Sequence, residues 1–165
     1  MANISAQAIT GGNLFINGIG MIGELMDAEL PKFEHETIET NAQIGKYEVV
    51  LPTLKPLNAK FSVNNVSPVY FSLLNTKITQ NIFIKKNLSS NGKETGIVVT
   101  CTGNIKLLET PKFEMNKEAV LTFEMSVTTL TYTIDNIPVL VYDAPNGIYI
   151  VDGVDIYEKI RKNIS

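Results

Sequence analysis

The sequence is poor in the residue types that build most small metal and redox sites. It has one cysteine (Cys101), one histidine (His35) and no tryptophan in 165 residues. A single cysteine excludes an intrachain disulfide, and one cysteine with one histidine excludes a zinc finger or a metalloprotease histidine pair. Cys101 alternates with core-type positions, which predicts a buried packing thiol rather than a nucleophile.

Positive charge is also scarce where it would signal targeting or nucleic-acid binding. Arg161 is the only arginine, and the net charge is −3. The first 31 residues contain no Lys or Arg, so the positive region of a signal peptide is missing. No apolar run approaches the length of about 18 residues that crosses a membrane. We therefore expect a protein that is made in the cytoplasm, has no membrane anchor and does not bind nucleic acid tightly.

The length and composition fit one globular domain over residues 1–165. Apolar residues make up 44% of the chain and charged residues 19%. A chain of this size buries enough surface to form a core without disulfides or metals. Residues 1–12 are small and polar and end in two glycines, which predicts a loose arm.

Strict alternation of apolar and polar residues predicts strands with one face in a core. It runs through 57–63, 97–107 and 121–127. After Thr128 the apolar phase moves to Leu130, and a one-residue phase change predicts a β-bulge near Thr128-Thr129.

Turn signals separate these strands into hairpins. Asn17-Gly18 predicts a tight turn, 139–142 pairs with 148–151, and a looser hairpin joins 82–84 to 97–99 across 87–96. Residues 34–46 are polar and acidic, which is typical of an extended loop or hairpin arm.

Capping signals predict two short helices. Ser67 is placed to cap a helix that begins at Pro68, and Asp155, with Glu158 three residues on, is placed to cap one at the end of the chain. The expected fold is mainly β: an antiparallel β-sandwich or barrel with one short flanking helix and a short C-terminal helix.

Two motifs have a chemical interpretation beside a structural one. Gly18, Gly20 and Gly23 match the dinucleotide-binding pattern G-x-G-x-x-G, but Pro31 leaves no room for the long helix that this site requires, so we assign the glycines to turns and a bulge. His35 lies between two glutamates and has no nucleophile beside it in sequence, so a solvated loop histidine is favoured over a catalytic base. We expect no enzymatic activity, no metal and no cofactor.

Both ends of the chain resemble the major tail tube protein of contractile-tailed bacteriophages and phage-tail-like bacteriocins. The opening segment has Asn13-Leu14-Phe15, spaced glycines and Leu30-Pro31-Lys32. The closing segment has a turn at Asp135-Asn136, followed by these elements of the family pattern: Val141-Tyr142-Asp143, Asn146-Gly147-Ile148, Val151-Asp152-Gly153-Val154-Asp155 and Arg161.

The resemblance implies a structural role in a virion. Six subunits would form a ring whose inner sheets join edge to edge into one barrel. Stacked rings would form a tube inside a contractile sheath, and the genome would pass through its lumen without specific binding. The implied partners are the chain itself and the sheath, baseplate and tape-measure proteins.

On that basis we expect two sets of assembly residues. The segment 34–56 would cross to a neighbouring subunit or to the next ring, with interface residues Ile38, Ile44, Tyr47, Val49 and Leu51. A polar strand face would line the lumen with Thr100, Thr102, Asn104, Thr122, Glu124, Ser126 and Thr128.

Three alternatives remain open from the sequence. The first is the tube protein of a type VI-like injection system, which shares the architecture. The second is a small-ligand β-barrel carrier, which requires an apolar interior pocket. The third, already disfavoured by the position of Pro31, is a dinucleotide-dependent enzyme that uses Gly18, Gly20 and Gly23.

Overall fold

The computed structural model describes residues 6–21 and 23–165. The strands are β1 (Ala8–Ile16), β2 (Ile19–Met21), β3 (Leu25–Glu29), β4 (His35–Ala42), β5 (Gly45–Leu54), β6 (Leu57–Val63), β7 (Gln80–Ser90), β8 (Lys93–Glu109), β9 (Leu121–Ile134), β10 (Ile137–Asp143), β11 (Ile148–Val151) and β12 (Val154–Asp155). The helices are α1 (Pro68–Ser72) and α2 (Glu158–Ile164). The prediction of a mainly β, antiparallel fold with two short helices is confirmed.

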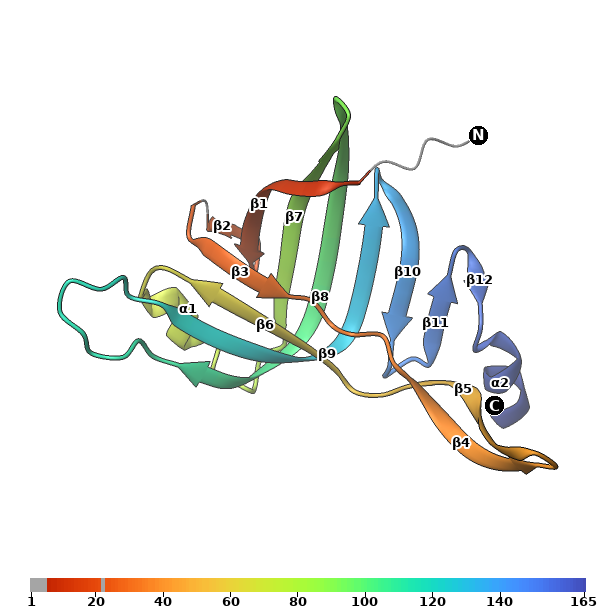
Figure 1. Ribbon diagram of the computed structural model, residues 1–165. Coiled ribbons are helices and arrows are strands. Elements are labelled where there is room, and N and C mark those ends of the chain that lie inside the picture. The colour runs from red at the N-terminus through yellow and green to blue at the C-terminus, as the bar shows by residue number, and fades with distance from the viewer. Residues whose placement is uncertain (1–5, 22) are drawn as a thin grey trace.

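Ten strands form one strongly curved antiparallel sheet (Figure 1). Its main path runs β12-β11-β10-β9-β8-β7-β1-β2. β9 changes partner along its length: its second half pairs with β10, and its first half pairs with β6, which in turn pairs with β3. The long strands β8 and β9 therefore belong to two sections of sheet that face different directions.

Bulges mark the bend between these sections. Thr102 pairs with Thr129 while Gly103 pairs with Val127, so Thr128 is an extra residue on β9. This confirms the predicted bulge. A second bulge on β8 leaves Lys106 without a cross-strand partner in the described part of the chain. Bulges bend strands and increase their twist, which lets the sheet wrap around a single core.

The core fills the space that the curved sheet encloses. The alternating positions of β6, β8 and β9 point inward, and Phe61 and Phe123 pack with ring centroids 5.2 Å apart. Cys101 is buried among them, as predicted, and burial raises the pKa of its thiol to about 12. α1 closes one end, where Tyr70 of the helix and its C-cap residue Leu73 are buried.

Four hairpins use two-residue turns in which both residues have positive φ. They are Asn17-Gly18, Asn91-Gly92, Asp135-Asn136 and Asp152-Gly153. This backbone conformation matches the right-handed twist of paired strands and favours Asn, Asp and Gly. The expectation of a loose hairpin across 87–96 is wrong, because β7 and β8 stay paired up to the Asn91-Gly92 turn.

The helix starts were predicted with mixed success. The Ser67 hydroxyl accepts a hydrogen bond from the Val69 N–H, and Pro68 is the first residue of α1. α2 begins at Glu158 after Tyr157, so Asp155 is not its N-cap. The Asp155 carboxylate instead accepts from the Tyr157 N–H and binds Arg161.

The two predicted arms differ in the structure. Residues 8–12 form the first half of β1 and pair with β7, so this part is not a loose arm; residues 1–5 lie outside the described residues. The segment 34–56 contains the β4–β5 hairpin, which is a separate two-stranded sheet that extends away from the curved sheet (Figure 1). We call this hairpin, residues 35–54, the arm.

Candidate functional site: the assembly surfaces

One section of the curved sheet presents a continuous polar surface. It consists of β3, β6, the first half of β9 and residues 104–109 of β8, and we call it the four-stranded section. Its inward residues are apolar and are either buried or partly buried against the core. Its outward residues form three rows across the strands: Asp27, Ser62, Thr122 and Glu109; Glu29, Lys60, Glu124 and Leu107; Asn58, Ser126 and Asn104.

The charges on this outward surface are mixed and mildly acidic. The surface carries four carboxylates (Asp27, Glu29, Glu109 and Glu124) and two ammonium groups (Lys60 and Lys106). The Lys106 Nζ donates to the Asn58 Oδ1 at 2.7 Å, so this ammonium group is held along the surface. A surface with excess negative charge repels phosphates instead of binding them.

The predicted lumen residues fall into two groups. Asn104, Thr122, Glu124 and Ser126 lie together on the outward face of the four-stranded section. Thr100 and Thr102 lie on the outward face of the other section, beside Phe83 and Thr129. Thr128 is the bulged residue between the groups, and its hydroxyl donates to the Thr102 carbonyl at 3.0 Å. The bend separates residues that the sequence pattern placed in one row.

Both edges of the four-stranded section are open. β3 pairs with β6 on one side, and no described strand pairs with its other side. β7 pairs with β8 only as far as Gly103, so residues 104–109 have an unpaired edge within the part of the chain that the structure describes. β3 and β8 run in opposite directions, because each neighbouring pair in the section is antiparallel. Unpaired edges of this kind are sites for strand pairing with another chain.

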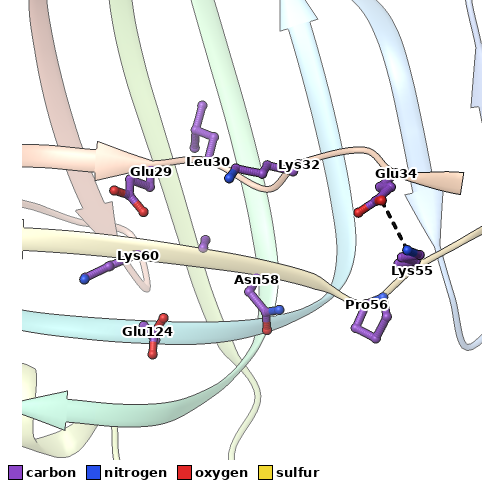
Figure 2. A pocket seen from close by; sticks show the side chains of 10 residues that line it. Glu29, Leu30, Lys32, Glu34, Lys55, Pro56, Asn58, Lys60 and Glu124 are labelled. Carbon is purple, nitrogen blue, oxygen red and sulfur yellow. Dashed lines mark hydrogen bonds and ion pairs between the residues drawn. The ribbon is translucent and has the colours of Figure 1, made fainter.

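A polar groove of about 610 Å³ runs beside this surface, between the segment after β3 and the start of β6 (Figure 2). Its lining includes three lysines and three glutamates: Lys32, Lys55, Lys60, Glu29, Glu34 and Glu124. The Lys55 Nζ donates to the Glu34 Oε1 at 3.1 Å, and this carboxylate raises the pKa of the ammonium group. The alternating charges give the groove no concentrated charge of either sign to select an ion.

The arm is exposed and its two faces differ in polarity. Cross-strand pairs put Ile38 beside Val49 and Thr40 beside Tyr47 on one face. The other face pairs Glu39 with Glu48, and the Lys46 Nζ lies 3.1 Å from Glu39. Of the predicted interface residues, Ile38, Ile44, Tyr47 and Val49 are at least 41% exposed and Leu51 is half-buried. Such an exposed apolar face is typical of an interaction site.

Contacts at its root fix how the arm leaves the sheet. The Lys55 N–H donates to the Glu34 carbonyl at 2.8 Å. His35 packs against Tyr149, with its Nε2 3.2 Å from the tyrosine hydroxyl. His35 is therefore half-buried against an aromatic ring, and the expectation of a solvated loop histidine is wrong. Burial raises the pKa of Tyr149, which stays a neutral hydrogen-bonding partner.

The C-terminal helix is tied to the β10–β11 hairpin by one arginine. The Arg161 Nη1 donates to the Gly147 carbonyl at 2.8 Å, and the guanidinium forms an ion pair with Asp155. The guanidinium holds the pKa of the Asp155 carboxyl below its usual range. The sequence analysis assigned Asp155 to a helix cap and missed this ion pair. An Asp and an Arg six residues apart across a turn give no periodic signal in the sequence.

The chemical motifs in the sequence have structural roles. Gly18 lies in the β1–β2 turn and Gly23 follows β2, both with positive φ, and the next described element is strand β3 instead of the helix that a dinucleotide site requires. Gly20 faces Phe15, where a Cβ would lie 3.1 Å from the ring. Among the described residues no group of three or more His, Cys, Asp or Glu side chains is placed to hold a metal ion. No helix in the described ranges has the length and apolarity to cross a membrane.

Solved structures with the same fold come from contractile injection systems. A sheath/tube terminator of an extracellular contractile injection system is 14% identical, with a TM-score of 0.56 over 74% of this chain and 92% of that one. The tube terminating cap of the anti-feeding prophage is 13% identical, with a TM-score of 0.58 over 74% of this chain and 87% of that one. A chain of a sheath-tube complex from an extracellular contractile injection system is 13% identical, with a TM-score of 0.55 over the same shares. At these identities the similarity shows the fold.

The sequence itself identifies the family. No curated protein matches this sequence. The family model for the phage tail tube protein FII matches residues 6–164, which includes every strand and helix described above. The resemblance to tail tube proteins is thus confirmed. The chain belongs to the phage tail tube protein FII family and is a structural, non-enzymatic component of a phage tail.

Proposed function

We propose that copies of this chain join side by side into rings, and that stacked rings form the inner tail tube through which the phage genome passes. One observation carries the proposal: the four-stranded section is polar on its outward face and, among the described strands, unpaired at both edges. Joining the β8 edge of one copy to the β3 edge of the next continues the antiparallel order. Closure of the ring removes every open edge of this section.

The outward face of the four-stranded section would then line the lumen. The lumen residues that we propose are Asn104, Thr122, Glu124 and Ser126. Thr100 and Thr102 lie on the other section of the sheet and would not face the lumen. The excess of carboxylates on this face suits a channel for DNA, because rows of Lys or Arg would bind phosphates and stop transit. The ring number of six, and the sheath, baseplate and tape-measure partners, follow from the family resemblance.

The arm would connect copies. An exposed hairpin with one apolar face, held at a fixed root, is suited to pack on a neighbouring subunit. Deletion of residues 36–48 removes no core residue, so we expect a folded protein that no longer forms tubes. Long intact tubes from that variant would contradict this role of the arm.

A pair of substitutions at Leu107 tests the lateral joint. Leu107 is 45% exposed at the open edge of β8, next to Glu124, and the β3 edge that would meet it carries Asp27 and Glu29. Leu107→Glu places like charges opposite one another, which opposes strand pairing, whereas Leu107→Lys places opposite charges there. We expect negative-stain microscopy to show tubes for wild type and Leu107→Lys, and loss of tubes for Leu107→Glu. Equal assembly of both folded variants would contradict the joint.

The alternatives have less support. The injection-system proteins named above share the fold, and the family match favours the phage tail over a type VI-like injection system. A ligand carrier requires an interior pocket, but the space inside the sheet is occupied by Phe61, Phe123 and Tyr70 and their neighbours.

A further inference from the structure

The arm is joined to the rest of the molecule by few contacts. Its two strands, β4 and β5, pair only with each other, and the arm leaves the curved sheet beside β11 (Figure 1). Among the described residues, one hydrogen bond links the arm to the curved sheet, between the Tyr149 hydroxyl and His35 Nε2 at 3.2 Å. The Lys55–Glu34 pair joins the two segments that enter the arm to each other. The angle of the arm therefore depends on a small set of contacts at its root.

Strand pairing within the arm is interrupted just above this root. His35 pairs with Leu54, and the next pair is Thr37 with Val50. One residue of β4 therefore lies opposite three residues of β5. Because the ladder of the outer arm does not continue to the root, it does not hold the His35–Leu54 pair in place. The root pair depends on contacts from outside the arm.

An aromatic cluster on the C-terminal part of the sheet supplies these contacts. Tyr149 of β11 is 4% exposed, and its ring centroid lies 5.9 Å from that of His35. Tyr142 and Tyr157 each pack edge-on against Tyr149, with ring centroids 6.3 Å apart. A hollow of about 150 Å³ beside these three tyrosines is lined on its arm side by Leu54. Both strands of the root thus border the three tyrosines, which we call the aromatic cluster.

The aromatic cluster is itself anchored. The Tyr149 carbonyl accepts from the Ile156 N–H at 2.9 Å, and Arg161 ties α2 to the Gly147 carbonyl. Burial raises the pKa of both Tyr149 and Tyr157, so their hydroxyls keep their protons near neutral pH. The hydrogen bond to His35 is therefore made by a neutral tyrosine on a fixed strand.

We propose that the aromatic cluster is a latch that holds His35, and through it the arm, at one angle in the unassembled copy. This rests on the proposed function, in which the arm packs on another copy. An arm already held at one angle loses less conformational freedom when it docks, and such preorganisation strengthens association. His35 and Tyr149 are then positioning residues, which act on assembly without touching the second copy.

Amide hydrogen exchange of the unassembled chain tests the latch without reference to tubes. His35→Ala removes the ring and its hydrogen bond, and Tyr149→Phe removes the hydroxyl alone. We expect both variants to lose protection in peptides that cover 34–36 and 53–55, because the root opens locally, and to keep it across 37–50. Since Tyr149→Phe keeps the buried ring, it decides the matter if His35→Ala does not fold.

Glu36→Ala is the matched control for the exchange experiment. Glu36 follows His35, is exposed and does not line the hollow at the aromatic cluster. We expect its root peptides to exchange as slowly as those of the parent chain. Root exchange at the control rate in a folded His35→Ala or Tyr149→Phe variant would overturn the latch.

Distances between spin labels test whether the latch fixes the angle of the arm. Nitroxides are attached at Val50→Cys on the arm and Ile137→Cys on the sheet, which are both at least 64% exposed, while Cys101 is 1% exposed and stays unlabelled. We expect a broader distance distribution when His35→Ala is added than when Glu36→Ala is added. Equal widths in the two folded proteins would overturn the proposal.

Tube growth then separates the latch from the tube function. His35→Ala should raise the protein concentration at which tubes appear in negative-stain microscopy, and the tubes should look like those of wild type. An unchanged concentration would overturn the preorganising role. If the wild-type chain forms no tubes, the proposed function fails and the role of the latch in assembly fails with it, and the exchange and distance results still decide whether the latch holds the arm.

Discussion

The bend in β8 depends on the absence of a side chain at Gly103. A Cβ at this position would lie 1.9 Å from the Ser126 carbonyl oxygen and 3.2 Å from the Val127 Cα. These are backbone atoms of the paired strand, so Gly103→Ala forces β8 and β9 apart where the sheet turns into the four-stranded section. Overpacking of this kind costs about 1–3 kcal/mol, and each ladder hydrogen bond lost adds about 1 kcal/mol. We expect a loss of at least about 3 kcal/mol in the free energy of unfolding.

Gly96→Ala is the matched control in the same strand. A Cβ at Gly96 meets no atom within 4 Å, and the residue does not have positive φ. We expect this variant to be as stable as wild type or more stable by about 0.4–1 kcal/mol, because alanine restricts the unfolded chain. The chain has no tryptophan, so urea unfolding is followed by far-UV circular dichroism. Equal midpoints for Gly103→Ala and Gly96→Ala would refute the account of the bend.

Three further outcomes are expected. Phe123→Ala should lower stability by about 3–5 kcal/mol, because the ring is fully buried; a loss below about 1 kcal/mol in urea would contradict the core assignment. Arg161 lowers the pKa of Asp155, so their pair adds stability above the ordinary carboxyl pKa of 3.8 and loses it as pH falls through the lowered value. Thermal melts should therefore show Asp155→Asn less stable than wild type at pH 7 and equal to it near pH 2, and a gap that is the same at both pH values would be inconsistent. Cys101 should resist iodoacetamide at pH 8 until the protein unfolds, and rapid labelling of native protein, seen by mass spectrometry, would show that the thiol is accessible.

The strands were predictable because their signals are local. Alternation through 57–63, 97–107 and 121–127 reports directly on burial, and the phase change after Thr128 located the bulge. Asn91-Gly92 is an equally strong local signal, and the long paired hairpin that it closes could have been predicted from that dipeptide.

The division of the polar strand faces into two groups could not be predicted from the strand pattern. Thr100, Thr102 and Glu124 share one polar face of their strands in sequence, but the bend at Gly103 and Thr128 turns the two halves in different directions. The partner exchange of β9, from β10 to β6, is a long-range pairing that periodicity does not encode.

Contacts between distant segments were likewise outside the reach of the sequence. The pairing of His35 with Tyr149 joins residues 114 positions apart. Apolar residues of the arm, such as Tyr47, were identified from the sequence because apolar side chains in a polar, charged segment are unusual.

Electron cryomicroscopy of assemblies formed by the purified chain tests the central claim most directly. The account predicts hollow tubes of stacked rings in which β8 of each copy pairs with β3 of its neighbour, with Asn104, Thr122 and Glu124 facing the lumen. Isolated single copies at high concentration, or tubes whose lumen is lined by the Phe83 and Thr100 face, would contradict it.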